Sequence, residues 1–157
     1  MQYKIITAFI TFAFILISID SYAQRVVNIR ELNFGKVAKP TSGNVWIVVR
    51  KNGSVGGGTT AIMLDTTAVS AGRERISGNK KRNIQISFDE CSGNSALGLQ
   101  LRRFTAYYGG VNFINAANGL PPAGKGQNLT YGATLVINSS TPGGVLTPCY
   151  NIDINYD

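Results

Sequence analysis

Residues 150–157 alternate between apolar and polar side chains. Tyr150, Ile152, Ile154 and Tyr156 share one parity, and asparagine or aspartate occupies every position of the other. Successive side chains of a β-strand point to opposite faces of a sheet, so the pattern predicts an amphipathic strand. We expect its four apolar side chains to face a core. The backbone of this strand must also pair with something, and the identity of that partner bears on function.

The interior of the chain has the pattern of short strands joined by turns. Ile84, Ile86 and Phe88 alternate with polar residues, as do the leucines at positions 97, 99 and 101. Further strands are predicted over residues 25–34, 45–49, 59–64 and 131–137, loops over 51–58, 118–128 and 139–144, and a short helix-like stretch over 68–74. Many short strands and eighteen glycines favour one all-β domain over residues 24–157, an immunoglobulin-like antiparallel β-sandwich.

Residues 1–23 have the pattern of a secretory signal peptide. Lys4 precedes an apolar run from Ile5 to Ile19, and Ser21-Tyr22-Ala23 is a small-x-small cleavage site. The run of 15 residues is shorter than the roughly 20 that span a bilayer, although a membrane anchor is the alternative. We expect export through a periplasm to the cell surface or the medium, with no transmembrane segment after cleavage.

The exported part is basic. The chain has 15 Lys and Arg and 8 Asp and Glu; without Lys4 and Asp20 these become 14 and 7, which leaves a net charge near +7. An exported protein is not expected to meet nucleic acid, so the charged partner to consider is an anionic polysaccharide or lipid. The alternative is a basic surface that is solvated and binds no partner. Residues 102–108 interleave charge and aromatic rings. One interpretation is a surface binding edge made of Arg102, Arg103, Tyr107 and Tyr108. The alternative places Phe104 in the core, with the arginines solvated and the two tyrosines half-buried.

The two cysteines, Cys91 and Cys149, both lie in the exported part, where thiols tend to oxidise. A bridge between them would close a loop of nearly 60 residues and stabilise the fold by about 4 kcal/mol in the chain-entropy model. It would join the start of the final strand to a mid-chain turn. The alternative is two unpaired thiols.

Enzyme chemistry has little support in the sequence. The chain has no histidine, which excludes Ser-His-Asp and Cys-His catalysis and the usual zinc sites. Residues 119–126 approach a P-loop, but Gly126 replaces the Ser or Thr that holds magnesium, and Pro121 and Pro122 lack the N–H groups that bind phosphate. A glycosidase carboxylate pair assembled from distant residues is the alternative. We predict a protein without catalytic, cofactor-binding or metal-binding residues.

Leu32–Val37, with the sequence LNFGKV, resembles the opening motif of an uncharacterised bacterial secreted domain family. Residues 131–136 and 150–156 look like the closing strand pair of that family, and residues 76–88 are similar to its middle part. The resemblance covers most of the exported chain. It implies a fimbrial-like domain without an established activity.

The final strand also resembles that of chaperone-usher pilus subunits, which end in an alternating strand with a penultimate tyrosine and a glycine fourteenth from the end. Tyr156 and Gly144 occupy those two positions. The resemblance implies an incomplete sandwich, in which the place beside the last strand is filled first by a periplasmic chaperone and then, at an outer-membrane usher, by the N-terminal extension of another subunit. This is β-augmentation. It implies a structural subunit of a fimbria whose assembly strand comprises Gly144, Tyr150, Ile152, Ile154 and Tyr156.

Two features depart from the pilus-subunit pattern. Only residues 24–31 precede the LNFGKV motif, and Glu31 interrupts the alternation of Val27 and Ile29. Val27, Ile29, Leu32 and Phe34 therefore belong either to a donor strand or to the first strand of the domain itself. A Cys91–Cys149 bridge would also differ from the common pilin disulfide, which joins early strands. The alternative function is a self-contained secreted or surface binding module with a complete sandwich and with glycans as its candidate ligand.

Overall fold

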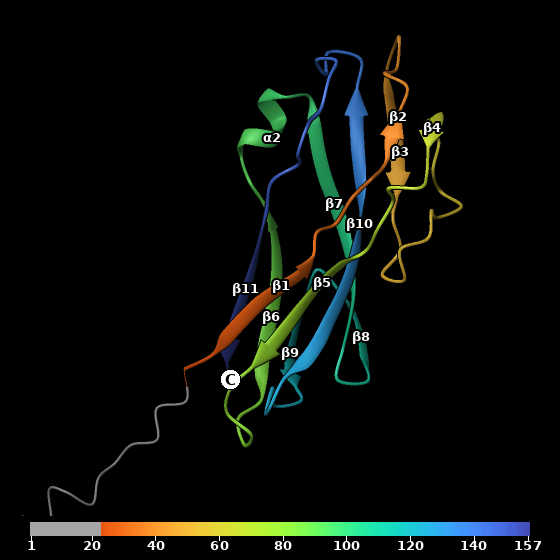
Figure 1. Ribbon diagram of the computed structural model, residues 1–157. Coiled ribbons are helices and arrows are strands. Elements are labelled where there is room, and N and C mark those ends of the chain that lie inside the picture. The colour runs from red at the N-terminus through yellow and green to blue at the C-terminus, as the bar shows by residue number, and fades with distance from the viewer. Residues whose placement is uncertain (1–22) are drawn as a thin grey trace, which may run out of the picture.

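The computed structural model describes residues 23–157, which are 53% strand and 3% helix (Figure 1). Antiparallel sheets pack in a sandwich-like arrangement, which confirms the predicted fold class. Apart from Ala23, the predicted signal peptide lies outside the described residues. Within them, no helix is both long enough and apolar enough to span a membrane.

The described residues form strands joined by short loops, with one helical turn. In chain order the elements are β1 (Arg25–Arg30), β2 (Lys36–Val37), β3 (Asn44–Val48), β4 (Met63–Asp65), β5 (Gly72–Ser77), β6 (Ile84–Glu90), α2 (Gly93–Ala96), β7 (Leu99–Tyr108), β8 (Val111–Ile114), β9 (Ala116–Leu120), β10 (Gln127–Asn138) and β11 (Tyr150–Tyr156).

One hydrogen-bonded path runs through most of these strands in the order β1-β5-β10-β7-β8-β9-β6-β11. The strand β3 joins β10 beyond the end of β5, and β2 pairs with β4 in a small separate sheet. In Figure 1, β1 and β5 cross in front of β6 and β11, so the path turns back on itself and forms two layers. The two ends of the path, β1 and β11, therefore lie at the same side of the sandwich.

The core lies between these layers and follows the alternation of the strands. Ile84, Ile86 and Phe88 of β6 point inward, as predicted, and so do alternate residues of β10 from Leu129 to Ile137. The ring of Phe88 stacks on that of Phe104, with centroids 5.0 Å apart. Phe104 is 3% exposed, which confirms the interpretation that places it in the core.

A β-bulge interrupts the pairing of β7 with β10. The register of β7 on β10 shifts between Arg102 and Thr105, and Arg103 has a φ of +49°. Beside the bulge, Phe104 N–H donates to Asn115 Oδ1 and Asn115 N–H donates to Phe104 O, both at 2.9 Å. Asn115 O accepts from Phe88 N–H at 2.9 Å. Asn115 thus connects β7 of one layer to β6 of the other and closes this side of the sandwich.

Several predicted elements are wrong in detail. The helix-like stretch 68–74 instead leads into β5, because its residues pair with β1 and β10. Most of the predicted strand 59–64 is irregular, because the hydroxyls of Thr59 and Thr60 bind the edge of β3 instead. The predicted loop 118–128 includes the end of β9 and the start of β10. Leu97 lies at the end of α2 rather than in a strand and is 36% exposed.

Candidate functional site

The outer edge of β11 is unpaired within the described residues. β11 pairs with β6 from Tyr150 opposite Glu90 to Tyr156 opposite Ile84. Just beyond the two ends of the strand, Cys91 N–H donates to Cys149 O and Asp157 N–H donates to Asn83 O. Because antiparallel bonding alternates along a strand, the odd-numbered residues of β11 bond to β6. The N–H and C=O groups of Ile152 and Ile154 point the other way, where no described backbone group meets them.

The side chains of β11 pack against the core as its alternation predicts, but they are only partly covered. Tyr150, Ile152, Ile154 and Tyr156 are half-buried against the core cluster, whereas the residues between them are exposed. On the neighbouring β6, Ile84 and Ile86 are 0% exposed. The core is therefore less well covered along β11 than one strand further in.

The edge of β3 is different, because the loop that follows this strand covers it. Trp46 N–H donates to Thr60 Oγ1 at 2.9 Å, and Val48 N–H donates to Thr59 Oγ1 at 3.0 Å. The carbonyls of Trp46 and Val48 accept from the backbone N–H groups of Thr60 and Gly56 at 2.8 and 2.7 Å. Covered edges of this kind prevent pairing with another chain, and β11 has no such cover among the described residues.

β1 lies at the same side of the sandwich and is also poorly covered. All six of its residues are exposed. Val26 is paired with Ile76, which is 0% exposed, so Val26 faces inward, yet it is 46% exposed. We call β1 and β11 together the open edge. Inward-facing apolar side chains of both strands remain accessible there.

A buried polar network lies behind the open edge. Glu74 Oε1 accepts hydrogen bonds from Asn28 Nδ2 at 3.1 Å and from the Tyr131 hydroxyl at 3.2 Å. The hydroxyls of Tyr131 and Tyr150 are 3.0 Å apart. Glu74 is 6% exposed, and burial raises the pKa of its carboxyl above the ordinary value. The network joins β1, β5, β10 and β11, so it links the two layers at the place where their edges are uncovered.

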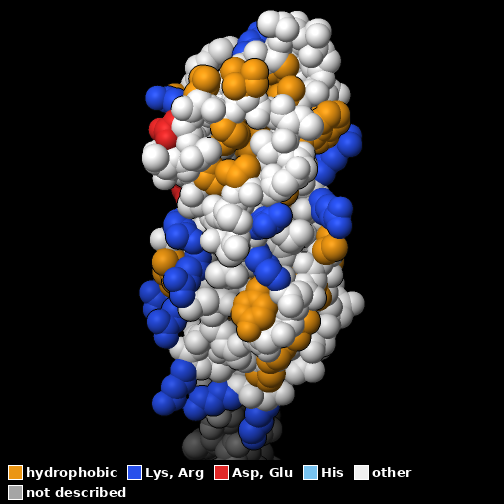
Figure 2. Space-filling model, turned by 90° about the vertical axis from the view of Figure 1, so that its right-hand side faces the viewer, with side chains coloured by type: hydrophobic (Ala, Val, Ile, Leu, Met, Phe, Trp, Pro, Cys, Tyr) orange, Lys and Arg blue, Asp and Glu red, His pale blue; other side chains and the backbone are white. Residues whose placement is uncertain are grey.

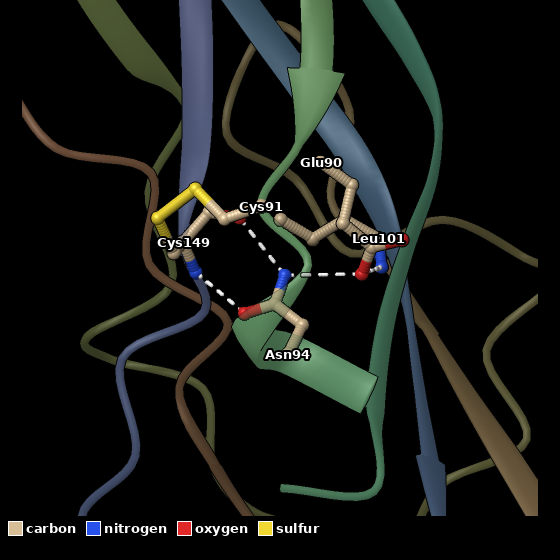
Figure 3. Close-up of a disulfide and its surroundings, with 5 residues drawn as sticks. All are labelled: Glu90, Cys91, Asn94, Leu101 and Cys149. Atoms are coloured by element: carbon tan, nitrogen blue, oxygen red, sulfur yellow. Dashed lines mark hydrogen bonds between the residues drawn. A yellow bond between two sulfur atoms is a disulfide. The ribbon is translucent and has the colours of Figure 1, made fainter. Parts of the chain in front are cut away.

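Both ends of β11 are attached to the rest of the domain. At its start, Cys91 and Cys149 form a disulfide with a Cα–Cα distance of 5.3 Å, which confirms the predicted bridge (Figure 3). Asn94 of α2 donates to Cys149 O and accepts from Cys149 N–H, both at 2.8 Å. Figure 3 shows the same amide reaching Glu90, whose carboxylate accepts from Leu101 N–H.

At the other end, the Tyr156 hydroxyl accepts from Asn79 N–H at 2.9 Å, and the Arg82 guanidinium lies 4.9 Å from the centre of the Tyr156 ring. The strand is therefore fastened at both ends while the backbone of its middle residues is free to pair.

The structure separates the residues proposed for a first or donor strand. Val27 is paired with the exposed Arg75 and faces outward, and Ile29 lies at a register shift and is 49% exposed. Leu32 packs half-buried against the core, and Phe34 is 7% exposed within it. Leu32 and Phe34 thus belong to the domain's own fold.

Two other predicted site residues lie in unexpected places. Gly144 is in the loop before β11, with a φ of +117° and open space around it, so its assignment to the assembly strand is wrong. Tyr108 is 0% exposed, because alternation turns it inward, and it cannot touch a surface ligand. Tyr107 is 42% exposed, and Arg102 and Arg103 are exposed.

The polar residues that support the site were not predicted. Asn94, Glu74 and Tyr131 come from three separate elements, and only the fold brings their partners within reach. In residues 23–157, no group of three or more His, Cys, Asp or Glu side chains is placed to hold a metal ion.

A family model described as "Domain of unknown function (DUF4402)" matches residues 25–156. The chain belongs to this family. The DUF4402 match starts at the first residue of β1 and ends at the last residue of β11, so both strands of the open edge are part of the family domain. This match confirms the predicted resemblance to an uncharacterised domain family. No curated protein and no solved structure is detectably similar to the chain.

Proposed function

We propose that this DUF4402 chain is a non-enzymatic structural subunit of a fimbria or related cell-surface assembly, and that it accepts a strand from a partner along the outer edge of β11. The observation that carries the proposal is the coincidence of two features at Ile152 and Ile154. Their backbone N–H and C=O groups point outward without a described partner, and their side chains are only half-buried against the core.

An added strand would satisfy both features at once. Its backbone would bond to Ile152 and Ile154, and its alternate side chains would cover the apolar residues of the open edge. Complete burial of a Val, Leu or Ile side chain contributes about 1.5–3 kcal/mol relative to exposure, so two or three such side chains would support a stable complex. The attachments at Cys149 and Tyr156 hold β11 in place, which reduces the entropy lost when a strand binds.

The chain is better suited to receive a strand than to give one. Its LNFGKV motif is part of its own fold, since Phe34 is in the core and Asn33 pairs with Ser70. β1 is already paired with β5. We therefore expect the donor to be a different protein: a periplasmic chaperone during export, and then another subunit at an outer-membrane usher.

Replacement of Ile154 by proline tests this mechanism. Proline removes the outward N–H of residue 154 and leaves the bonds of Asp153 and Asn155 to β6 in place, as edge strands tolerate. The matched control is Ile154→Thr, which also removes apolar surface but keeps the N–H. Each full-length chain would be produced in the native host, and periplasmic complexes and sheared surface polymers would be measured on native and unheated denaturing gels.

The wild type and Ile154→Thr should enter complexes and polymers, whereas Ile154→Pro should remain a folded monomer by circular dichroism. A wild type that is always monomeric, or a proline variant that assembles as well as the threonine variant, would contradict strand addition at β11.

A further inference from the structure

The outer face of the sheet that contains β1, β5, β10 and β7 carries a concentration of arginines. Cross-strand partners share a face, so the register places Arg30 beside Arg73, and Arg73 beside Thr130. Thr130 is in turn paired with Tyr107. The alternate residues of β5 and β10, such as Ile76 and Leu129, are 0% exposed and point into the core, so this row points outward.

Two more rows extend this surface. Arg75 lies two residues from Arg73 on β5 and is paired with Val27, and Arg25 follows on β1 opposite Ser77. Further along β10, Arg102 is paired with Thr134. We call the surface formed by these residues the basic face: Arg25, Arg30, Arg73, Arg75, Arg102 and Tyr107.

The two outer surfaces of the sandwich differ in charge. The outward positions of β1, β5, β10 and β7 contain no Asp or Glu, because Glu74 faces inward. The outward positions of β6 and β11 contain Asp89 and Asp153 and no Lys or Arg. In Figure 2, which shows the right-hand side of Figure 1, Lys and Arg side chains occur from the top to the bottom of the surface, whereas Asp and Glu are visible only near its upper left edge. Among the outward positions of these strands, the positive charge therefore lies on the surface formed by β1, β5, β10 and β7.

Contacts with the backbone hold some of these arginines in place. Arg30 Nε donates to Ala71 O at 2.8 Å. The Arg75 guanidinium lies against Gly126, where an added Cβ would be 2.6 Å from Arg75 Nε. A planar guanidinium held in this way is well suited to a carboxylate, which it can bind through two parallel hydrogen bonds.

An aromatic ring lies within the same surface. Tyr107 is 42% exposed, and Lys51 Nζ lies 5.7 Å from its ring centre. An exposed tyrosine offers an apolar ring face together with a polar hydroxyl, which suits a ligand with both C–H and O–H groups. The arginines are spread over three strands, β1, β5 and β7, rather than converging on one point, which favours an extended polymer over a small molecule.

We infer that the basic face binds an acidic polysaccharide that carries carboxylate groups. The arginines bind the carboxylates and Tyr107 packs against a sugar ring. This surface is distinct from the outer edge of β11, so the inference does not rest on strand addition.

The test measures binding of the purified exported chain to polygalacturonate by calorimetry, at low and at physiological ionic strength, with the neutral polymer pullulan for comparison. Arg73→Gln/Arg75→Gln removes two charges from the basic face, and Arg25→Gln/Arg30→Gln removes two others in case the first variant does not fold. The matched control, Lys80→Gln/Lys81→Gln, removes two charges from the exposed loop between β5 and β6. Tyr107→Ala tests the ring.

We expect binding to polygalacturonate that weakens with salt, and little binding to pullulan. The arginine variants should bind about tenfold more weakly, since each removes charge-assisted hydrogen bonds, and the lysine control should stay close to the wild type. Tyr107→Ala should weaken binding without changing its salt dependence. Equal losses in the arginine and lysine variants, no binding to polygalacturonate, or tighter binding to single-stranded DNA or to anionic lipid vesicles would overturn the inference.

Discussion

The side-chain amide of Asn94 pairs with the backbone of Cys149 through two hydrogen bonds, each 2.8 Å long. The amide presents one donor and one acceptor, as a peptide group of a neighbouring strand would. Asn94 is 1% exposed and also donates to Glu90 Oε1 at 3.0 Å. The start of β11 is thus positioned by a side chain from a four-residue helix as well as by the disulfide.

Replacement of Asn94 by alanine should destabilise the oxidised protein by about 2–3 kcal/mol, because Cys149 N–H loses its acceptor and Cys149 O and Glu90 Oε1 each lose one of two donors. Urea unfolding at neutral pH would measure the change. Ser95→Ala is the control, since it removes one exposed bond to Ser92 O in the same helix and should cost less than about 0.5 kcal/mol. Similar losses in both variants would contradict the role assigned to Asn94.

Gly78→Ala should destabilise the wild type by about 1–3 kcal/mol, because an added Cβ would collide with the Tyr156 hydroxyl. In a Tyr156→Phe background the nearest remaining ring atom would be Cζ, at 3.4 Å, so the same substitution should cost much less. A double-mutant cycle by thermal unfolding would measure this coupling. Additive effects would show that the hydroxyl does not constrain residue 78.

Glu74→Gln should change how stability depends on pH. Burial raises the folded-state pKa of Glu74 above its ordinary value of 4.5, so the unfolded state releases its proton first as pH rises. The stability that the Glu74 carboxyl contributes to the wild type is present below pH 4.5, its ordinary pKa. It is lost as the pH rises through the folded-state pKa. Glutamine keeps the acceptor for Tyr131 and Asn28 and has no proton to lose.

The Glu74→Gln variant should therefore match the wild type at pH 4 and exceed it in stability at pH 7. Denaturant unfolding across this range would test the difference. Glu31→Gln, which removes an exposed carboxyl that lies near Glu74 in space, controls for net charge. A constant difference between Glu74→Gln and the wild type at every pH would contradict the burial effect.

Amide hydrogen exchange should alternate along β11. The N–H groups of Asp153 and Asn155 bond to β6 and should exchange slowly, whereas those of Ile152 and Ile154 should exchange quickly. Binding of a partner strand should slow the fast pair selectively. NMR exchange rates would measure both states.

The covered edge of β3 provides the control for this exchange pattern. Trp46 and Val48 also have outward N–H groups, but threonine hydroxyls bind them, so both should be protected in the free protein. Uniform protection along β11 would show that its edge is already covered.

Prediction from sequence worked best where the evidence was local. The alternation of residues 84–88 and 150–156 identifies two strands and their inward faces, because side-chain direction follows directly from the strand period. It failed where distant contacts decide conformation. The stretch 68–74 has a helix-like pattern, but pairing with two other strands leads it into β5.

The candidate site was predicted in outline only. Its apolar residues were found by their parity, but Asn94 and Glu74 were missed, since a single polar residue in a sequence does not reveal which backbone or side chain it will meet. Val27 and Ile29 were grouped by alternation, whereas the pairing of β1 with β5 turns Val26 inward instead. The register of β1 on β5 then shifts between Asn28 and Arg30, and no local sequence pattern predicts this shift.

The sequence by itself determined the fold class, the single pair of cysteines that could form a bridge, and the side of β11 that faces the core. Each depends on composition or on a period of two residues. Only the tertiary structure decided that the outer edge of β11 has no described partner while that of β3 is covered, and that four arginines of β1 and β5 lie on one face. Those properties depend on which strands pair and in what register, and these follow from contacts between residues far apart in the chain.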